Sequence, residues 1–320
     1  MRTKALALLS GEGTTIPAAE ARALFETYDP TSVFEVPEER ILIAETDADT
    51  RVVSSRVAFS RRVGLLLDGR EDVARMVEGK RIRFRSFSLP GADSSREPDP
   101  GLFLRGINAT VDLDTPELEI SLVRGRRTYL LASYPTQMNQ AWAKRRPRRR
   151  PFFHPSAIFP KLSRALVNLS RCREGEVILD PFAGTGSILI EASCIGLTAV
   201  GLDRSTKMSR GAMSNMRGFD QSWMGVVMAD AFSAPVRTVQ GIVTDVPYGR
   251  ASSALGRAAS DVVRTSLEKL PDLVPPGRRI VIMHPKTEVV AGTERLSVEE
   301  NHHLYMHRNL TRTITVLRRR

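Results

Sequence analysis

The stretch VILDPFAGTGSILIEA at residues 177–192 decides the fold class of this chain. An apolar run ends in Asp180, glycines follow at positions 184 and 186, and a helix-like apolar pattern starts directly after them. This is the pattern of a buried β-strand, a tight turn and the first turn of a helix. Glycine lets a ligand approach the backbone, and a helix N-terminus offers unpaired N–H groups with partial positive charge. The stretch therefore predicts a strand–turn–helix unit that binds a ligand at its turn.

Strand-like and helix-like patterns alternate on both sides of this stretch. Helices are predicted over residues 160–171, from residue 186 and over residues 205–219, and strands over residues 176–180, 198–203, 225–228, 241–244, 279–283 and 311–317. Strands that alternate with helices form right-handed crossovers and a doubly wound parallel sheet, which binds ligands at the carboxyl ends of its strands. We therefore expect an α/β domain that closes with a C-terminal hairpin. Before residue 134 the patterns are those of smaller α+β units, with helices predicted over about residues 17–28 and 71–78.

The residues of the turn narrow the choice of ligand. An NTPase phosphate loop needs Lys and Ser or Thr after the second glycine, and a dinucleotide-binding turn needs a third glycine where Leu189 stands, so both are disfavoured. Carboxylates end the first two strands, at Asp180 and Asp203, and a third, Asp230, follows the next strand. Asp180 suits a cationic ammonium, Asp203 suits ribose hydroxyls, and Asp230 with the N–H of Ala231 suits the edge of adenine. S-adenosyl-L-methionine carries all of these groups and is the predicted cofactor.

A second motif, Asp245-Val246-Pro247-Tyr248, follows the strand-like residues 241–244. Methylation of an exocyclic base amine requires that the nitrogen be held in line with the methyl group. The Asp245 carboxylate and the Val246 carbonyl can each accept one N–H, Tyr248 can stack on the base, and Pro247 makes the turn rigid. These four residues are the predicted catalytic residues.

The two motifs, with FFHPSAIFPKLSRALVNLS at residues 152–170, resemble those of the THUMP-domain RNA N2-guanine methyltransferases, specifically the archaeal tRNA guanosine-10 type. AFSRRVGLLL at residues 58–67 and VDLDTPELEISLVRGRRTYLLAS at residues 111–133 resemble THUMP segments. The resemblance implies a Rossmann-like S-adenosylmethionine methyltransferase domain preceded by α+β ferredoxin-like and THUMP domains. The implied boundaries are 1–55 for the ferredoxin-like domain, 56–133 for the THUMP domain, 134–151 for a basic linker and 152–320 for the methyltransferase domain.

The same resemblance implies the roles of individual residues. The first aspartate of the turn, its phenylalanine and its glycines match the methionine-binding turn, and the later aspartates match the ribose, adenine and catalytic positions. The full predicted cofactor-binding set is Asp180, Phe182, Gly184, Thr185, Gly186, Asp203, Arg204, Asp230 and Ala231. The sequence departs from the family pattern at Val246, where the family usually has proline. Because that residue is expected to act through its carbonyl, the chemistry survives with a less preorganised loop.

The charge of the chain indicates a polyanionic partner. Forty-seven Lys and Arg residues stand against 36 Asp and Glu residues, which gives a formal net charge of +11. Six of the seven residues 144–150 are basic, and Trp142 precedes them. Such a segment could neutralise phosphates and stack a base, although a solvated linker has the same composition. The predicted RNA-binding residues are Trp142, Lys144, Arg145, Arg146, Arg148, Arg149 and Arg150.

Histidines and cysteines add little chemistry to this picture. We expect His154 to line a pocket or support structure, and His302 and His303 to be exposed on the hairpin. Cys172 and Cys194 cannot form a tetrahedral thiolate zinc site by themselves, and no HExxH or CxxC spacing occurs, so no metal is expected.

The predicted reaction is S-adenosylmethionine-dependent methylation of guanosine N2 in tRNA, at position 10, giving the monomethyl nucleoside, with the addition of a second methyl group left open. Another tRNA guanosine, adenine N6, and a non-catalytic RNA-binding scaffold remain the alternatives. No apolar run is long enough to span a bilayer, so we expect a soluble cytoplasmic protein. We expect a monomer that binds tRNA, and leave open whether a small activator subunit is required.

Overall fold

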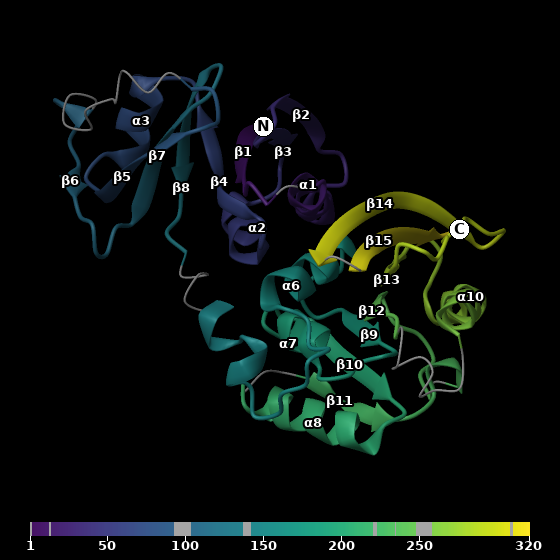
Figure 1. Cartoon of the computed structure of the whole chain (residues 1–320). Coiled ribbons are helices and arrows are strands. Elements are labelled where there is room, and N and C mark those ends of the chain that lie inside the picture. The colour runs from purple at the N-terminus through teal and green to yellow at the C-terminus, as the bar shows by residue number, and fades with distance from the viewer. Residues whose placement is uncertain are drawn as a thin grey trace. The chain divides into compact units, whose positions relative to one another are not determined.

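The computed structural model describes residues 2–12, 14–92, 104–136, 142–219, 223–233, 235–247, 258–307 and 310–320. The chain divides into two compact units, the first containing residues 1–12 and 24–138 and the second residues 13–23 and 139–320 (Figure 1). Among the residues in these ranges, the strands of each unit form one β-sheet. Within the described ranges, no helix is long and apolar enough to cross a membrane.

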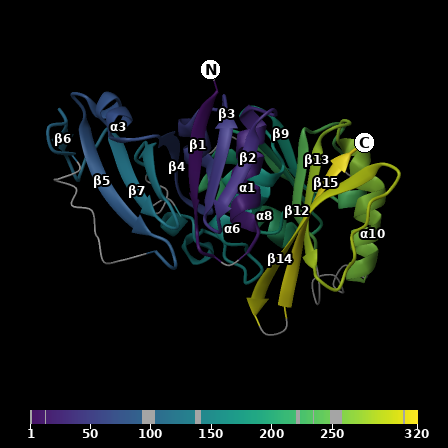
Figure 2. The same cartoon turned by 90° about the horizontal axis from the view of Figure 1, so that it is seen from above.

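The first unit is built on one eight-stranded mixed sheet with the order β2-β3-β1-β4-β8-β7-β5-β6. Figure 2 shows its strands side by side, from β6 to β2. The strands are β1 (Thr3–Leu9), β2 (Val33–Glu38), β3 (Ile41–Thr46), β4 (Ser60–Leu67), β5 (Arg81–Ser88), β6 (Thr110–Val111), β7 (Leu118–Arg124) and β8 (Thr128–Ser133). Because β1 pairs directly with β4, the sheet continues across residue 55, and the division into ferredoxin-like and THUMP domains stays a prediction.

In the part of the chain that the structure describes, the helices before residue 92 are α1 (Ile16–Tyr28), α2 (Thr50–Arg56) and α3 (Arg70–Val77). The sequence patterns predicted α1 and α3 but not α2. Two adjacent valines within a seven-residue helix look like part of a strand, because β-branched residues favour strands. The signal that could have revealed α2 is Asp49, whose side chain accepts the N–H of Arg51 at 2.8 Å and caps the helix.

The second unit contains a seven-stranded sheet with the order β11-β10-β9-β12-β13-β15-β14. The five strands from β11 to β13 are parallel, and β15 runs antiparallel to β13 and β14. This confirms the predicted doubly wound sheet and C-terminal hairpin. The strands are β9 (Val177–Asp180), β10 (Thr198–Asp203), β11 (Trp223–Met228), β12 (Gly241–Asp245), β13 (Arg279–Pro285), β14 (Leu296–His307) and β15 (Leu310–Arg319). The helices are α6 (Pro160–Leu169), α7 (Ser187–Ser193), α8 (Thr206–Arg217) and α10 (Ala259–Lys269), with single turns η1 (Pro147–Arg149), η2 (Ala231–Ser233) and η3 (Leu270–Leu273).

Apolar side chains hold helices on the sheet of the second unit. Leu179, Ile242 and Ile280 form one buried cluster with Val262 and Val263 of α10. Each such side chain stabilises the fold by roughly 1.5–3 kcal/mol when fully buried. The strand order reverses between β9 and β12, and doubly wound sheets bind their ligands at the carboxyl ends of the strands at such a reversal. The fold therefore places the ends of β9, β10 and β12, with their aspartates, at one edge of the sheet.

Candidate cofactor and catalytic site

Asp180, the last residue of β9, is buried and 2% exposed. Its Oδ1 accepts the hydroxyl of Thr244 at 2.7 Å and the N–H of Phe182 at 3.1 Å. Burial raises the pKa of Asp180 to about 7, against the opposing effect of these two hydrogen bonds. Thr244 directly precedes Asp245, so one hydrogen bond connects the turn after β9 to the end of β12.

The turn after β9 has the backbone that its glycines predict. Gly184 and Gly186 have φ angles of 53° and 77°, in the left-handed region that disfavours other residues. A Cβ atom at Gly186 would lie 3.3 Å from the Cβ of Ala212, so α8 also packs closely against this turn. Helix α7 starts directly after it, at Ser187. The predicted strand–turn–helix unit is confirmed.

Asp203, the last residue of β10, is bonded to the same turn. Its Oδ2 accepts the N–H of Gly184 at 3.0 Å, and its Oδ1 accepts the N–H of Ser205 at 2.8 Å. Burial raises the pKa of Asp203, while both hydrogen bonds oppose this. The carboxylate therefore joins the turn to the start of α8 and lies partly open at the sheet edge.

Asp230 lies beyond β11, before the buried Ala231 that opens η2. Its Oδ1 accepts the N–H of Phe232 at 2.8 Å, and its Oδ2 lies 3.7 Å from Nε of Arg204. The rings of Phe232 and Phe182 meet edge to face with centroids 5.9 Å apart. Asp230 is thus held at the same edge as the preceding carboxylates, with an aromatic pair beside it.

The chemistry of these groups fits S-adenosylmethionine. Three carboxylates follow successive strands, and the turn between the first two offers close backbone approach at Gly184 and Gly186. Ammonium, ribose hydroxyl and adenine amino groups are all hydrogen-bond donors that carboxylates accept. Thr185 is an exception within the predicted set. Its side chain is buried and bonded to Ser187 Oγ at 3.1 Å, so that side chain supports the turn from inside.

Asp245 ends β12 opposite Met283 of β13 in the parallel register. Its carboxylate forms an ion pair with the guanidinium of Arg312 on β15, a residue that the sequence patterns did not single out. Tyr248 lies outside the described residues. The structure thus places Asp245, Val246 and Pro247 of the predicted catalytic motif at the sheet edge.

Val246 replaces the proline of the family pattern in a specific way. Its N–H donates to the carbonyl of Met283 at 2.9 Å, a bond that proline could not make. Its side chain is fully buried in the same apolar cluster as Ile242. Val246 lacks the ring by which proline would fix φ, but its hydrogen bond and its core packing hold the backbone in place. These contacts offset the expected loss of preorganisation in the loop.

Part of the basic segment is packed, which contradicts the prediction that all of it faces RNA. Arg145 donates from Nε and Nη2 to the two carboxylate oxygens of Glu191, at 2.6 and 3.1 Å, and Arg164 donates to the same carboxylate at 2.9 Å. Both guanidinium groups lie over the ring of Trp142, at 5.0 and 5.3 Å from its centroid. Glu191 of α7 is fully buried. The prediction of RNA contact is wrong for Arg145, because its guanidinium pairs with a buried carboxylate, and for Trp142, because its ring is buried against the Arg145 and Arg164 guanidinium groups.

Arg150 is likewise buried rather than presented to solvent. It donates to Ser187 Oγ at 2.6 Å and to the carbonyls of Arg145 and Ile158 at 3.0 and 3.3 Å. The prediction of an RNA contact is wrong for Arg150 as well, since its donors bind the start of α7 and its own segment. The exposed basic residues of the segment are Lys144, Arg146, Arg148 and Arg149.

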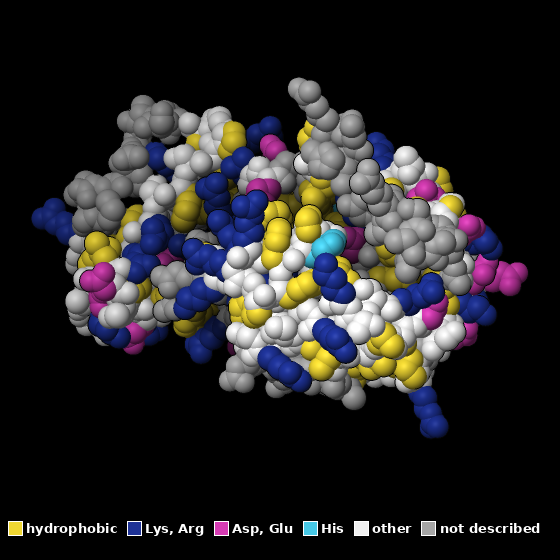
Figure 3. Space-filling view, turned by 60° about the horizontal axis from the view of Figure 1, so that its bottom comes forward, with side chains coloured by type: hydrophobic (Ala, Val, Ile, Leu, Met, Phe, Trp, Pro, Cys, Tyr) yellow, Lys and Arg dark blue, Asp and Glu magenta, His cyan; other side chains and the backbone are white. Residues whose placement is uncertain are grey.

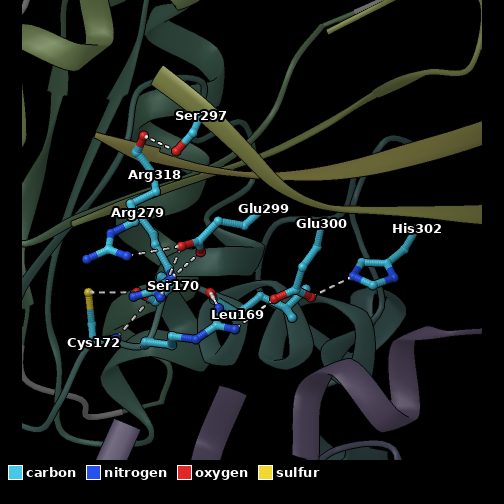
Figure 4. Close-up of polar contacts among 10 residues, drawn as sticks. Leu169, Ser170, Cys172, Arg279, Ser297, Glu299, Glu300, His302 and Arg318 are labelled. Atoms are coloured by element: carbon cyan, nitrogen blue, oxygen red, sulfur yellow. Dashed lines mark hydrogen bonds and ion pairs between the residues drawn. The ribbon is translucent and has the colours of Figure 1, made fainter. Parts of the chain in front are cut away.

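The histidines take local structural positions. His154 Nδ1 accepts the N–H of Ser156 at 3.3 Å and lies 2.7 Å from its hydroxyl. His302 is only 6% exposed, so the expectation of an exposed residue is wrong for it, whereas His303 is exposed. Nε2 of His302 lies 2.9 Å from Glu300, which also accepts from Arg171 at 2.7 Å (Figure 4). Burial of Glu300 would raise its pKa, but these two donors lower it overall.

Comparison with known proteins agrees with this geometry. A family model described as an RMKL-like methyltransferase domain matches residues 147–314. The tRNA (guanine(10)-N2)-dimethyltransferase of Methanothermobacter thermautotrophicus is 30% identical over 333 residues, covering 98% of this chain and 99% of the relative. A relative of the same name from Methanocaldococcus jannaschii is 31% identical over 229 residues, covering 68% of this chain and 63% of the relative.

The fold also has a counterpart among solved structures. The crystal structure of TrmN from Thermus thermophilus superimposes with a TM-score of 0.52 at 19% identity, covering 99% of this chain and 100% of that one. The near-complete coverage of the archaeal relative at 30% identity decides the family. This chain belongs to the family of the tRNA (guanine(10)-N2)-dimethyltransferases.

Proposed function

We propose that this protein methylates the exocyclic N2 of guanosine at position 10 of tRNA, with S-adenosylmethionine as the methyl donor. The observation that carries the proposal is the place of Asp245. It is a partly buried carboxylate at the carboxyl end of β12, and the adjacent Thr244 is bonded to Asp180 of the cofactor turn. The relatives named for this reaction support the substrate and the addition of two methyl groups.

The cofactor-binding roles follow from the chemistry at each strand end. Asp180 holds the ammonium group, Asp203 the ribose hydroxyls, and Asp230 with the N–H of Ala231 the adenine edge. When bound, S-adenosylmethionine supplies a methyl group whose bond to sulfur breaks, with the electron pair staying on sulfur, as the new carbon–nitrogen bond forms. Gly184 and Gly186 let the backbone of the turn approach the cofactor.

The catalytic motif holds the attacking nitrogen. Guanine N2 has two N–H donors and a lone pair delocalised into the ring, so it needs two acceptors and a fixed orientation. The Asp245 carboxylate accepts one N–H, and the Val246 carbonyl accepts the other. N2 gains the methyl group and loses one proton, to Asp245 or to water. A second round on the remaining N–H gives the dimethyl nucleoside.

Exposed basic residues of the second unit are suited to the tRNA backbone. Lys144, Arg146, Arg148 and Arg149 are exposed, and the guanidinium of Arg148 lies 6.0 Å from the ring centroid of Phe153. Phe153 is itself 46% exposed, so a base could stack on it beside a phosphate contact. Lys and Arg side chains are spread over the face drawn in Figure 3, where acidic side chains are fewer. We further propose a monomeric, cytoplasmic enzyme.

The test uses an unmodified tRNA transcript, labelled S-adenosylmethionine and mass mapping of the digested nucleosides. N2-methylguanosine should form in the native transcript and disappear when guanosine 10 and its pairing partner are exchanged for another pair. Label on another guanosine or on adenine would overturn the target. No label despite measured cofactor binding would leave the scaffold alternative, unless a cell extract restores transfer, which would indicate an activator subunit.

A further inference from the structure

Arg312 is a buried cation beside the catalytic carboxylate. Its side chain is 3% exposed, and it forms an ion pair with Oδ1 of Asp245. Burial lowers the pKa of Arg312 to about 9. Burying a guanidinium group costs free energy unless a partner compensates for its lost hydration. The burial of Arg312 therefore makes its ion pair with Asp245 important.

The sheet register fixes the two residues on the strands β12 and β15, which flank β13. Asp245 pairs with Met283 of β13, and Arg312 pairs with Pro285 of the same strand. Arg312 thus reaches Asp245 across β13. The carbonyl of Met283 accepts Nη2 of Arg312 at 3.3 Å and the N–H of Val246 at 2.9 Å. One backbone carbonyl therefore positions both the cation and the residue that follows Asp245.

We propose that Arg312 is a positioning residue for methyl transfer: it occupies Oδ1 of Asp245 and keeps this carboxylate ionised, so that Oδ2 accepts a hydrogen from guanine N2. The inference rests on the proposed function. With Oδ1 occupied by Arg312, a proton on Oδ2 would place a donor opposite the N–H groups of guanine N2, so Oδ2 can accept from N2 only while Asp245 is ionised. An opposite charge at contact distance favours the ionised form of a carboxyl group.

The other charged groups near Asp245 do not replace this cation. Asp180 on β9 bears the same charge sign as Asp245 when ionised. His284 on β13 contacts the Pro285 carbonyl and the Thr315 hydroxyl, each at 2.9 Å, and burial lowers its pKa. Helix α6, which also packs on β12, carries Lys161 and Arg164, and Arg164 donates to Glu191. Among the described residues, Arg312 is the cation in contact with Asp245.

The test compares Arg312→Gln and Arg312→Lys with the wild type, measuring kcat against pH at saturating cofactor and tRNA. Arg312→Gln should lower kcat about 100-fold at neutral pH and shift the acid limb of the profile to higher pH, because Asp245 then protonates more readily. Arg312→Lys should keep the acid limb near its wild-type position. In an Asp245→Asn background, Arg312→Gln should cause no further loss, since no carboxylate remains to be held.

Arg171→Gln is the matched control. Arg171 is also largely buried, and it likewise donates to a carboxylate, that of Glu300, and to a main-chain carbonyl, that of Leu169. The Arg171→Gln variant should leave kcat and its dependence on pH unchanged. The inference is overturned if Arg312→Gln keeps the wild-type profile, or if it loses cofactor affinity and thermal stability to the same extent as activity.

A second readout does not depend on methyl transfer. With ¹³C-labelled aspartate, the carboxyl signal that is absent from Asp245→Asn reports the titration of Asp245 directly. This titration should move to higher pH in Arg312→Gln. A wild type that stays inactive even with cell extract would refute the proposed function, whereas an unshifted Asp245 titration would refute the role of Arg312.

Discussion

Cofactor binding should strengthen as pH rises towards neutrality because of Asp180. With its pKa at about 7 in the free protein, ionising this buried carboxyl group costs about 4 kcal/mol more than in water. The protonated Asp180 therefore contributes to the stability of the folded protein. This contribution is fully present below pH 4 and is lost as pH rises through 7. A bound ammonium group compensates for the buried negative charge, so cofactor and ionised Asp180 should favour each other.

The size of the effect follows from the ionised fraction of Asp180. In the free protein, with the pKa at about 7, this fraction rises from about 3% at pH 5.5 to about 75% at pH 7.5; if the ammonium group keeps Asp180 ionised in the complex over this range, Kd should tighten about 25-fold. We would measure the Kd of S-adenosylhomocysteine by calorimetry over this range, below the pH at which its own amine loses its proton. Binding near pH 6.5 should also release a proton, visible as a dependence of the heat on the buffer.

Two controls make this prediction refutable. Asp180→Asn should bind with an affinity that hardly changes with pH, and 5′-methylthioadenosine, which lacks the ammonium group, should show the same flat dependence on the wild type. If S-adenosylhomocysteine binds the wild type equally at pH 5.5 and 7.5, or if Asp180→Asn keeps the slope, the pairing of Asp180 with the ammonium group is wrong.

Three further predictions address the other parts of the site. Asp245→Ala should leave the cofactor Kd within about threefold and lower single-turnover transfer at least about 100-fold, and retained turnover would remove Asp245 from catalysis. Replacing the exposed basic residues Lys144, Arg146, Arg148 and Arg149 with Gln should weaken tRNA binding and flatten the slope of log K against log salt, and an unchanged slope would argue against phosphate contacts. By contrast, Arg145→Gln should lower the Tm, because Arg145 pairs with the buried Glu191. Val246→Pro should lower stability by about 1 kcal/mol through loss of its hydrogen bond to Met283, measured by urea unfolding, and a more stable variant would contradict this account.

The elements of the second unit could be predicted from sequence because their signals are local. The apolar run before Asp180, the two glycines and the helix-like pattern after them are read within sixteen residues, and all three elements form as expected. The positions of Asp203 and Asp245 follow from the same rule, since the carboxyl ends of parallel strands meet at one edge. Helix α10 carries no motif and escaped prediction.

Which of the basic side chains are buried could not be predicted, because a run of arginines has the same sequence pattern whether its side chains are exposed to solvent or packed inside the protein. Arg145 and Arg150 find their partners on α7, far along the chain. The residue that could have indicated this packing is their neighbour Glu191, the one carboxylate in the otherwise uncharged segment SILIEAS. A carboxylate buried with that helix requires a basic partner. Arg312 was missed because nothing near it in sequence indicates Asp245.

The hydrogen bonds that Met283 accepts have a consequence for how this enzyme can diverge. Asp245, Met283 and Arg312 lie on β12, β13 and β15, so their spacing is set by strand pairing and not by the length of any loop. Insertions and deletions accumulate in loops, whereas paired strands resist them. The segments around the site can therefore drift, and with them the choice of RNA, while the reacting groups keep their spacing. Substrate range and chemistry are in this way separable by mutation.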